Sequence, residues 1–117
     1  MINLITLFQN KLFNPTISVT IILPTKDRSG TVIPDYQTKH DVMLESIARQ
    51  FGGYTRIDGK CGWYNGTLIE ESNFIVTVWG KRNQLVEYFI TLAHAVKSDL
   101  NQDAVYLQVS NHAPQFI

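Results

Sequence analysis

Hydrophobic and polar residues alternate most clearly over residues 17–23, and this period of two predicts a β-strand. One face of that strand carries its apolar side chains, which are Ile17, Val19, Ile21 and Leu23. Residues 104–110 alternate in the same way and predict the last strand of the chain. Residues 54–64 and 67–79 predict two more strands, and the first of these contains two glycines at which we expect a bulge.

The dipeptide Asn65-Gly66 separates these two middle strands. Both residues tolerate the positive φ angles of a type I′ turn, so the pair predicts a β-hairpin with a two-residue turn. Such a turn would place Tyr64 opposite Thr67 and Cys61 opposite Glu70.

Two other segments repeat apolar residues at helical spacing. The first follows Asp35, a favoured N-cap residue, and ends at Gly52-Gly53, where glycine supplies a left-handed C-cap. The second follows Asn83 and runs to about Leu100. The apolar faces are His40, Met43, Leu44, Ile47, Ala48 and Phe51 in the first helix, and Leu85, Phe89, Leu92, Ala93, Val96 and Leu100 in the second.

The element order is therefore βαββαβ, which predicts an α+β protein with the ferredoxin-like arrangement. In that arrangement a four-stranded antiparallel sheet carries both helices on one face. A chain of 117 residues without a linker or repeat predicts a single domain over residues 17–117. Residues 1–16 are expected to form an N-terminal arm or a short helix, which Pro15 closes because the residue before a proline disfavours helix.

The second face of the predicted sheet is open and carries large apolar side chains. They are Ile22, Ile75, Trp79 and Tyr106. An exposed patch of this kind marks an interaction site, and a homodimer that packs sheet against sheet is the favoured explanation. The alternatives are cover by the N-terminal arm and a platform for a ligand or RNA, although the base-stacking motif of RNA-binding sheets is missing.

Composition narrows the function classes. Hydrophobic residues make up 44% of the chain and its formal net charge is zero, which disfavours nucleic acid as a partner because phosphate neutralisation drives that binding. No apolar run approaches the roughly 20 residues of a membrane span, and no basic region precedes the apolar N-terminus as in a signal peptide, so we expect a cytoplasmic location. The single Cys61 excludes an internal disulfide, no Cys or His spacing suits zinc, and no cofactor is expected.

Five residues are candidates for binding a small anionic molecule or nucleotide. Lys26 and Arg28 lie in a loop with Ser and Gly, where backbone amides and cations suit an anion. Tyr54 follows the first helix and Trp63 lies near the hairpin, where each side chain can contact a ligand. Glu70, near the sheet edge, is the residue for which we expect a perturbed pKa. Each residue also has a structural interpretation as a solvated loop, a helix stop, a packed aromatic or an edge charge.

The sequence offers less support for catalysis, and no catalytic residue is assigned. No motif places a base beside Cys61 to form the reactive thiolate. Glu70 and Glu71 are neighbours in a strand and face opposite sides, so they cannot act together on one substrate. The histidines lie on the two helices and in the C-terminal tail: His40, His94 and His112.

The run Phe51-Gly52-Gly53-Tyr54-Thr55, followed by Gly62-Trp63-Tyr64, Gly66 and Glu70, carries a resemblance to a known family. The pattern resembles a family of small, mostly uncharacterised ferredoxin-like proteins of bacteria and phages. The resemblance covers residues 42–80, with a weaker continuation over residues 102–109. It implies the fold and leaves the function open.

The favoured functional hypothesis is a non-catalytic, homo-oligomeric protein that binds a small molecule or nucleotide, such as a phage or plasmid accessory protein. Its ligand would lie near the five candidate residues. One alternative is a small dimeric α+β-type enzyme that uses Glu70 or a histidine as acid or base. Another is a protein-interaction module that uses the open sheet face.

Overall fold

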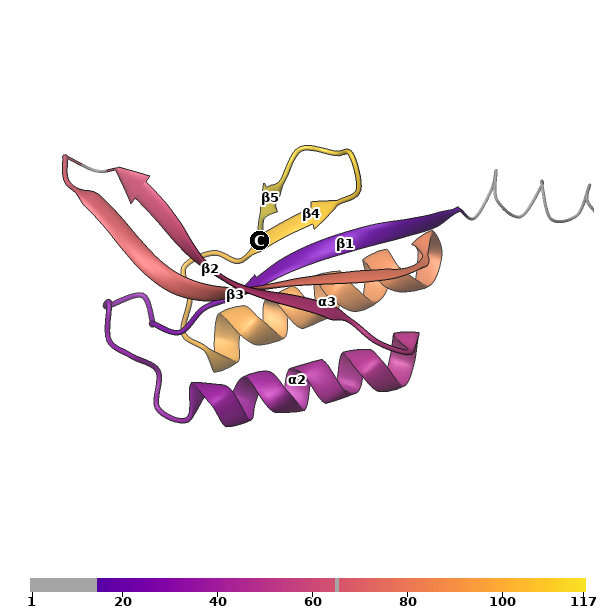
Figure 1. Cartoon of the computed structure of the whole chain (residues 1–117), viewed down its shortest axis with the longest axis horizontal. Coiled ribbons are helices and arrows are strands. Elements are labelled where there is room, and N and C mark those ends of the chain that lie inside the picture. Colours follow the sequence, from indigo (N-terminus) through magenta and orange to yellow (C-terminus); the bar gives the residue numbers. More distant parts are fainter. Residues whose placement is uncertain (1–14, 65) are drawn as a thin grey trace, which may run out of the picture.

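The computed structural model describes residues 15–64 and 66–117. Within them the chain forms two helices and one five-stranded antiparallel sheet, as β1 (Thr16–Leu23), α2 (Tyr36–Phe51), β2 (Thr55–Tyr64), β3 (Leu68–Lys81), α3 (Arg82–Asp99), β4 (Tyr106–Val109) and β5 (Gln115–Phe116). The order across the sheet is β2-β3-β1-β4-β5. Both helices lie against one face of the sheet (Figure 1). The arm or short helix predicted for residues 1–16 lies, except for its last two residues, outside the described part of the chain.

The predicted α+β class is confirmed, but the prediction of four strands is corrected by β5. This strand has two residues and directly follows Pro114, so it is too short to leave an alternating pattern in the sequence. It pairs with β4, joining Tyr106 to Phe116 and Leu107 to Gln115. The C-terminal residues therefore extend the sheet at its edge.

The β2–β3 hairpin differs from the prediction in its register. Cys61 pairs with Glu71 rather than with Glu70, and the connection spans residues 65–67, one residue more than expected. Gly66 in this connection has a φ of 75°, which glycine adopts without strain. The β2–β3 ladder runs without interruption, so the bulge expected at the β2 glycines is corrected as well.

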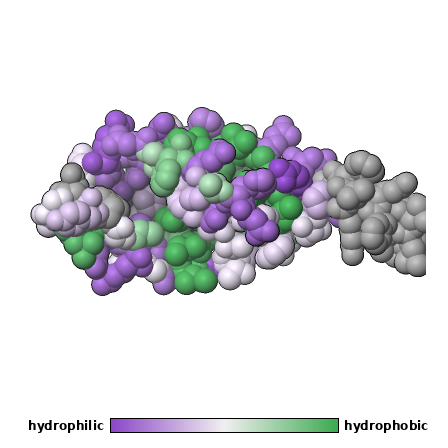
Figure 2. Space-filling view, turned by 90° about the horizontal axis from the view of Figure 1, so that it is seen from above, coloured by the Kyte–Doolittle hydropathy of each residue, from purple (hydrophilic) through white to green (hydrophobic). Residues whose placement is uncertain are grey.

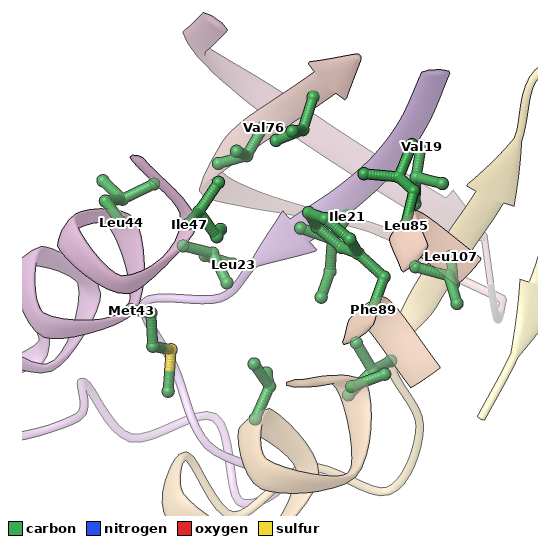
Figure 3. Close-up of a cluster of buried hydrophobic side chains, with 14 of the residues drawn as sticks. Val19, Ile21, Leu23, Met43, Leu44, Ile47, Val76, Leu85, Phe89 and Leu107 are labelled. Atoms are coloured by element: carbon green, nitrogen blue, oxygen red, sulfur yellow. The ribbon is translucent and has the colours of Figure 1, made fainter. Parts of the chain in front are cut away.

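The hydrophobic core lies between the sheet and the helices and is built from the predicted apolar faces. Figure 3 shows the buried side chains Val19, Ile21, Leu23, Met43, Leu44, Ile47, Val76, Leu85, Phe89 and Leu107 meeting there. Burial of each large apolar side chain stabilises the fold by about 1.5–3 kcal/mol relative to exposing it. Because this core fixes the inward face of every central strand, the alternate residues are directed to the open face.

The helix ends agree only in part with the predicted caps. Asp35 precedes α2, but its side chain makes no capping hydrogen bond and its φ is 53°. Gly52 ends α2 with a φ of 88°, and its N–H donates to the Ala48 carbonyl at 2.8 Å, as predicted. α3 begins at Arg82, so Asn83 lies in its first turn rather than at the N-cap. Neither helix is long and apolar enough to cross a membrane.

Candidate functional site

A pocket of about 530 Å³ opens on the sheet face that the helices leave uncovered. Its volume is within the range of small-molecule sites, about 300–1,000 Å³. Residues from all five strands line it, together with the segment between α3 and β4. Figure 2 looks onto this side of the molecule and shows hydrophobic residues gathered near its middle. The pocket therefore joins segments that are far apart in the sequence.

One end of the pocket is polar and lies on β2 and β3. Cys61 and Glu71 are direct partners in the β2–β3 ladder, and both line the pocket. Asn73 lies two residues beyond Glu71 on β3, so the two side chains share a face, about 7 Å apart at twice the strand rise. A carboxylate, a thiol and a carboxamide therefore meet at this end.

Asn73 is unusual because it is buried without satisfying its carbonyl oxygen. Its exposed fraction is 6%, and its Oδ1 has no hydrogen-bond partner. Gly59, its partner on β2, has no side chain that could donate to it. An unpaired buried acceptor costs about 1–3 kcal/mol of folding free energy. The carboxamide is therefore held among its neighbours at this end of the pocket, at a cost to the fold.

The other end of the pocket is aromatic and lies on β4 and β5. The rings of Tyr106 and Phe116 pack edge to face, with centroids 5.8 Å apart. The Tyr106 hydroxyl donates to Gln108 Oε1 at 2.8 Å, which orients the ring. Ile22 of β1 lines the pocket between the polar and aromatic ends. This apolar surface suits the flat face of an aromatic ligand.

Hydrogen bonds at the end of β1 hold the pocket wall in place. The buried Thr25 hydroxyl donates to the Ser72 carbonyl at 2.7 Å, which ties the chain after β1 to β3 between Glu71 and Asn73. Gln102 lines the pocket, and its Nε2 donates to the Lys26 carbonyl at 2.7 Å. The wall thus depends on contacts between distant segments.

The predicted anion-binding loop is bound to the protein itself. Arg28 Nε donates to Asn101 Oδ1 at 2.7 Å, and the guanidinium forms an exposed ion pair with Asp103 at 3.8 Å. The Lys26 carbonyl accepts the hydrogen bond from Gln102. Both cations lie beside the segment that follows α3, outside the pocket lining.

Two of the remaining predicted ligand residues, Tyr54 and Glu70, lie outside the pocket lining. Tyr54 is 43% exposed in the α2–β2 connection. Glu70 is exposed on β3 and, by alternation, faces away from Glu71 and the pocket. The side chain of Trp63 lies outside the described residues. The pocket described above includes neither Tyr54 nor Glu70, so a binding role for them stays a separate prediction.

The predicted interface residues do lie on the open face. Ile22 and Tyr106 are half-buried in the pocket lining. Ile75 is half-buried beside them on β3, whereas Trp79 is 64% exposed near the far end of that strand. Part of the predicted patch is therefore pocket wall.

The histidines lie away from the pocket. His40 is 1% exposed on the helix side; its Nε2 donates to the Pro24 carbonyl at 2.8 Å, and its Nδ1 has no partner. Burial lowers the pKa of His40 because the charged ring loses its hydration, and Arg56 adds to this by repulsion, against the Pro24 carbonyl and Asp41. His94 and His112 are exposed.

The residues that form the pocket carry only weak signals in the sequence. Glu71 was visible as one of two adjacent carboxylates, and the alternation of β3 places it with Ile75 on the open face. Asn73 and Phe116 carried no motif at all. They were identifiable only from burial and from a strand that the sequence did not predict.

No protein-family model and no curated protein matches the chain. Among solved structures, the chain is similar to a phage SAM lyase in complex with S-methyl-5′-thioadenosine, with a TM-score of 0.66 and 11% identity, covering 87% of this chain and 88% of that chain. It is also similar to a phage SAM lyase in the apo state, with a TM-score of 0.64 and 13% identity, covering 86% and 87%. The TM-scores show a shared fold, and at identities this low the similarity shows the fold alone.

These similarities contradict the predicted non-catalytic binding protein, because both neighbours are enzymes. The non-catalytic function was predicted because no sequence motif places a base beside Cys61 or two carboxylates on one face. The pocket gathers Cys61, Glu71 and Tyr106 from three strands, which no local motif records. The resemblance to small bacterial and phage proteins stays a prediction.

Proposed function

We propose that this protein is an enzyme that cleaves a carbon–sulfur bond of an adenosyl sulfonium compound such as S-adenosylmethionine (SAM). The observation that carries the proposal is the pocket with one aromatic and one acidic end, in a fold shared with a phage SAM lyase. The fold is a ferredoxin-like arrangement in which β5 extends the β2-β3-β1-β4 sheet.

The two ends of the pocket match the two ends of such a substrate. Tyr106 and Phe116 offer ring surface for the adenine, which stacks on aromatic side chains. Glu71 offers a negative charge for the cationic sulfonium and amino-acid end. Three strand spacings separate β3 from β5, about 14 Å, which leaves room for a nucleoside with a short chain.

The proposed reaction needs neither water nor a redox partner. When the bond between sulfur and the amino-acid chain breaks, both electrons remain on sulfur, which leaves as neutral S-methyl-5′-thioadenosine. The carbon chain regains an electron pair from within itself, either from its carboxylate, which closes a ring, or from a neighbouring C–H bond, whose proton passes to a base. Glu71 compensates the positive charge in the first route and accepts the proton in the second.

The test is to incubate the protein with SAM and to follow S-methyl-5′-thioadenosine by chromatography, with mass spectrometry of the second product. Glu71→Gln keeps the side-chain shape and removes the charge, so it is expected to lower kcat/KM by about 100-fold or more. Glu70→Gln is the matched control, because Glu70 is the adjacent carboxylate on the opposite face; it is expected to stay within about twofold of wild type. No product from the wild type, or equal losses in both variants, would refute the proposal.

We also propose that a second copy of the chain covers the rest of the open face. Trp79 is 64% exposed there, and Ile57 and Ile69 of the same face are exposed as well. Trp79→Glu is expected to shift the mass measured by light scattering towards the monomer, whereas Val42→Glu on the exposed side of α2 leaves it unchanged. A monomeric wild type would refute this part.

A further inference from the structure

The outer side of β2 is a long edge of the sheet. β2 lies at one end of the order β2-β3-β1-β4-β5, so among the described residues its ten residues pair with β3 alone (Figure 1). The strand contains no proline and its ladder with β3 has no bulge, so two features that commonly protect a sheet edge are missing from it. The backbone N–H and C=O groups that point away from β3 can therefore pair with another strand.

The charged side chains of β2 determine how two copies of this edge can pair. Arg56, Asp58 and Lys60 alternate in sign along the strand. They share the helix side of the sheet, because Arg56 opposes the buried Val76 and residues two apart face the same way. Arg56 Nε donates to Asp58 Oδ1 at 3.0 Å, but the Asp58 side chain is 68% exposed and can accept a second cation. Lys60 is exposed and forms no ion pair with a described residue.

The charges favour one register for such a pairing. In a symmetric antiparallel pair, the central residue of one strand lies opposite its own copy. A pair centred on Asp58 or on Lys60 would oppose like charges, which destabilises a sheet. A pair centred on Gly59 instead opposes Asp58 of each copy to Lys60 of the other, so both contacts are attractive. This register pairs residues 55–63, whereas registers centred beyond 58–60 pair fewer residues of β2.

We propose that two copies of the chain join through their β2 edges, antiparallel and centred on Gly59, into one continuous sheet. This contact is independent of the proposed reaction, and it leaves the open face free for the second contact proposed above. In this register Ile57, which is 59% exposed on the open face, lies opposite the partner's Cys61 at the rim of the pocket. Each copy therefore contributes an apolar side chain beside the pocket of the other.

A disulfide between Ile57→Cys and the native Cys61 tests the register directly. Opposed residues of antiparallel strands have Cα atoms about 4.5–5.5 Å apart, a separation that a disulfide spans. Within one chain, positions 57 and 61 are four residues apart in a strand, about 13 Å, which is too far. Mild oxidation is therefore expected to convert most of Ile57→Cys into a covalent dimer on a non-reducing gel.

Two controls show whether that disulfide is specific. The double variant Ile57→Cys, Cys61→Ser lacks the second thiol and is expected to stay monomeric on the same gel. Val42→Cys adds an equally exposed thiol on α2, away from the edge, and is expected to form no covalent dimer. Equal amounts of dimer in either control and in Ile57→Cys would overturn the proposed register.

A charge exchange tests the same register without a covalent bond. Asp58→Lys places a lysine opposite the partner's Lys60, and Lys60→Asp places an aspartate opposite the partner's Asp58. Each variant alone turns two attractive contacts repulsive and is expected to weaken association through this edge by about 10- to 100-fold. An equimolar mixture of the two variants is expected to restore association, because two lysines of one chain then face two aspartates of the other.

Light scattering over a range of protein concentrations measures this association, and circular dichroism checks that each variant is folded. Lys97→Asp makes the same charge change at an exposed position of α3 and is expected to associate as wild type does. A mixture that associates no better than either variant alone would overturn the register, as would the absence of a covalent dimer from Ile57→Cys.

The outcomes also separate this contact from the one proposed for the open face. If Trp79→Glu lowers the mass while Asp58→Lys and Lys60→Asp leave it unchanged, the open-face contact stands and the β2 contact fails. If the charge variants lower the mass and their mixture restores it, the β2 contact stands whatever the effect of Trp79→Glu. Cleavage of SAM is measured separately and decides neither contact.

Discussion

The aromatic end of the pocket gives the sharpest single prediction, because Phe116 contributes to the pocket and little to the core. Its exposed fraction is 70%, and its ring packs edge to face on Tyr106 with centroids 5.8 Å apart. Removing the mostly exposed ring in Phe116→Ala forfeits a minor part of the about 1.5–3 kcal/mol that full burial would supply, so we expect the free energy of unfolding to fall by about 0.5–1 kcal/mol. Ligand stacking on an aromatic ring contributes about 1–3 kcal/mol per base, so the Kd for S-methyl-5′-thioadenosine should rise by about 5- to 150-fold.

Isothermal titration calorimetry with S-methyl-5′-thioadenosine, together with urea unfolding, measures both quantities. Tyr54→Ala is the matched control, because Tyr54 is also an exposed aromatic residue but lies outside the pocket lining. Its Kd should equal that of wild type. An unchanged Kd for Phe116→Ala, or an equal rise in both variants, would refute the placement of the base at the β4–β5 end.

Three other measurements test the packing of the fold. Thr25→Val removes the 2.7 Å hydrogen bond to the Ser72 carbonyl and should lower the free energy of unfolding by about 1–2 kcal/mol in urea titrations. Phe89→Ala empties a fully buried position and should cost about 3–5 kcal/mol, seen as a lower melting temperature. Because the pKa of His40 is lowered on folding, the unfolded chain protonates first; stability should be full above about pH 6.5 and fall as the pH drops towards the folded pKa. The urea midpoints at pH 7.5 and 5 should differ less in His40→Gln than in wild type, whereas exposed His94→Gln keeps the wild-type difference.

The sequence alone determined the parts of the fold that have a local cause. Alternation over residues 17–23 and helical spacing around Ile47 and Phe89 specify which faces are apolar, and each face needs only its own segment to be recognised. The Gly52 cap is equally local, since the left-handed backbone there requires a residue without a Cβ. These features sufficed for the α+β class.

Only the tertiary structure decided the register of the hairpin, the fifth strand and the site. The pairing of Cys61 with Glu71 depends on the length of the turn, and β5 exists because β4 offers it an edge, not because its two residues favour a strand. The pocket draws on every strand, so no single segment records it, and Asn73 becomes conspicuous only once its burial and its missing partner are known. Local periodicity indicates which side of a helix or strand faces the core. A binding site depends instead on which helices and strands become neighbours. Contacts between residues that are distant in the chain determine that arrangement.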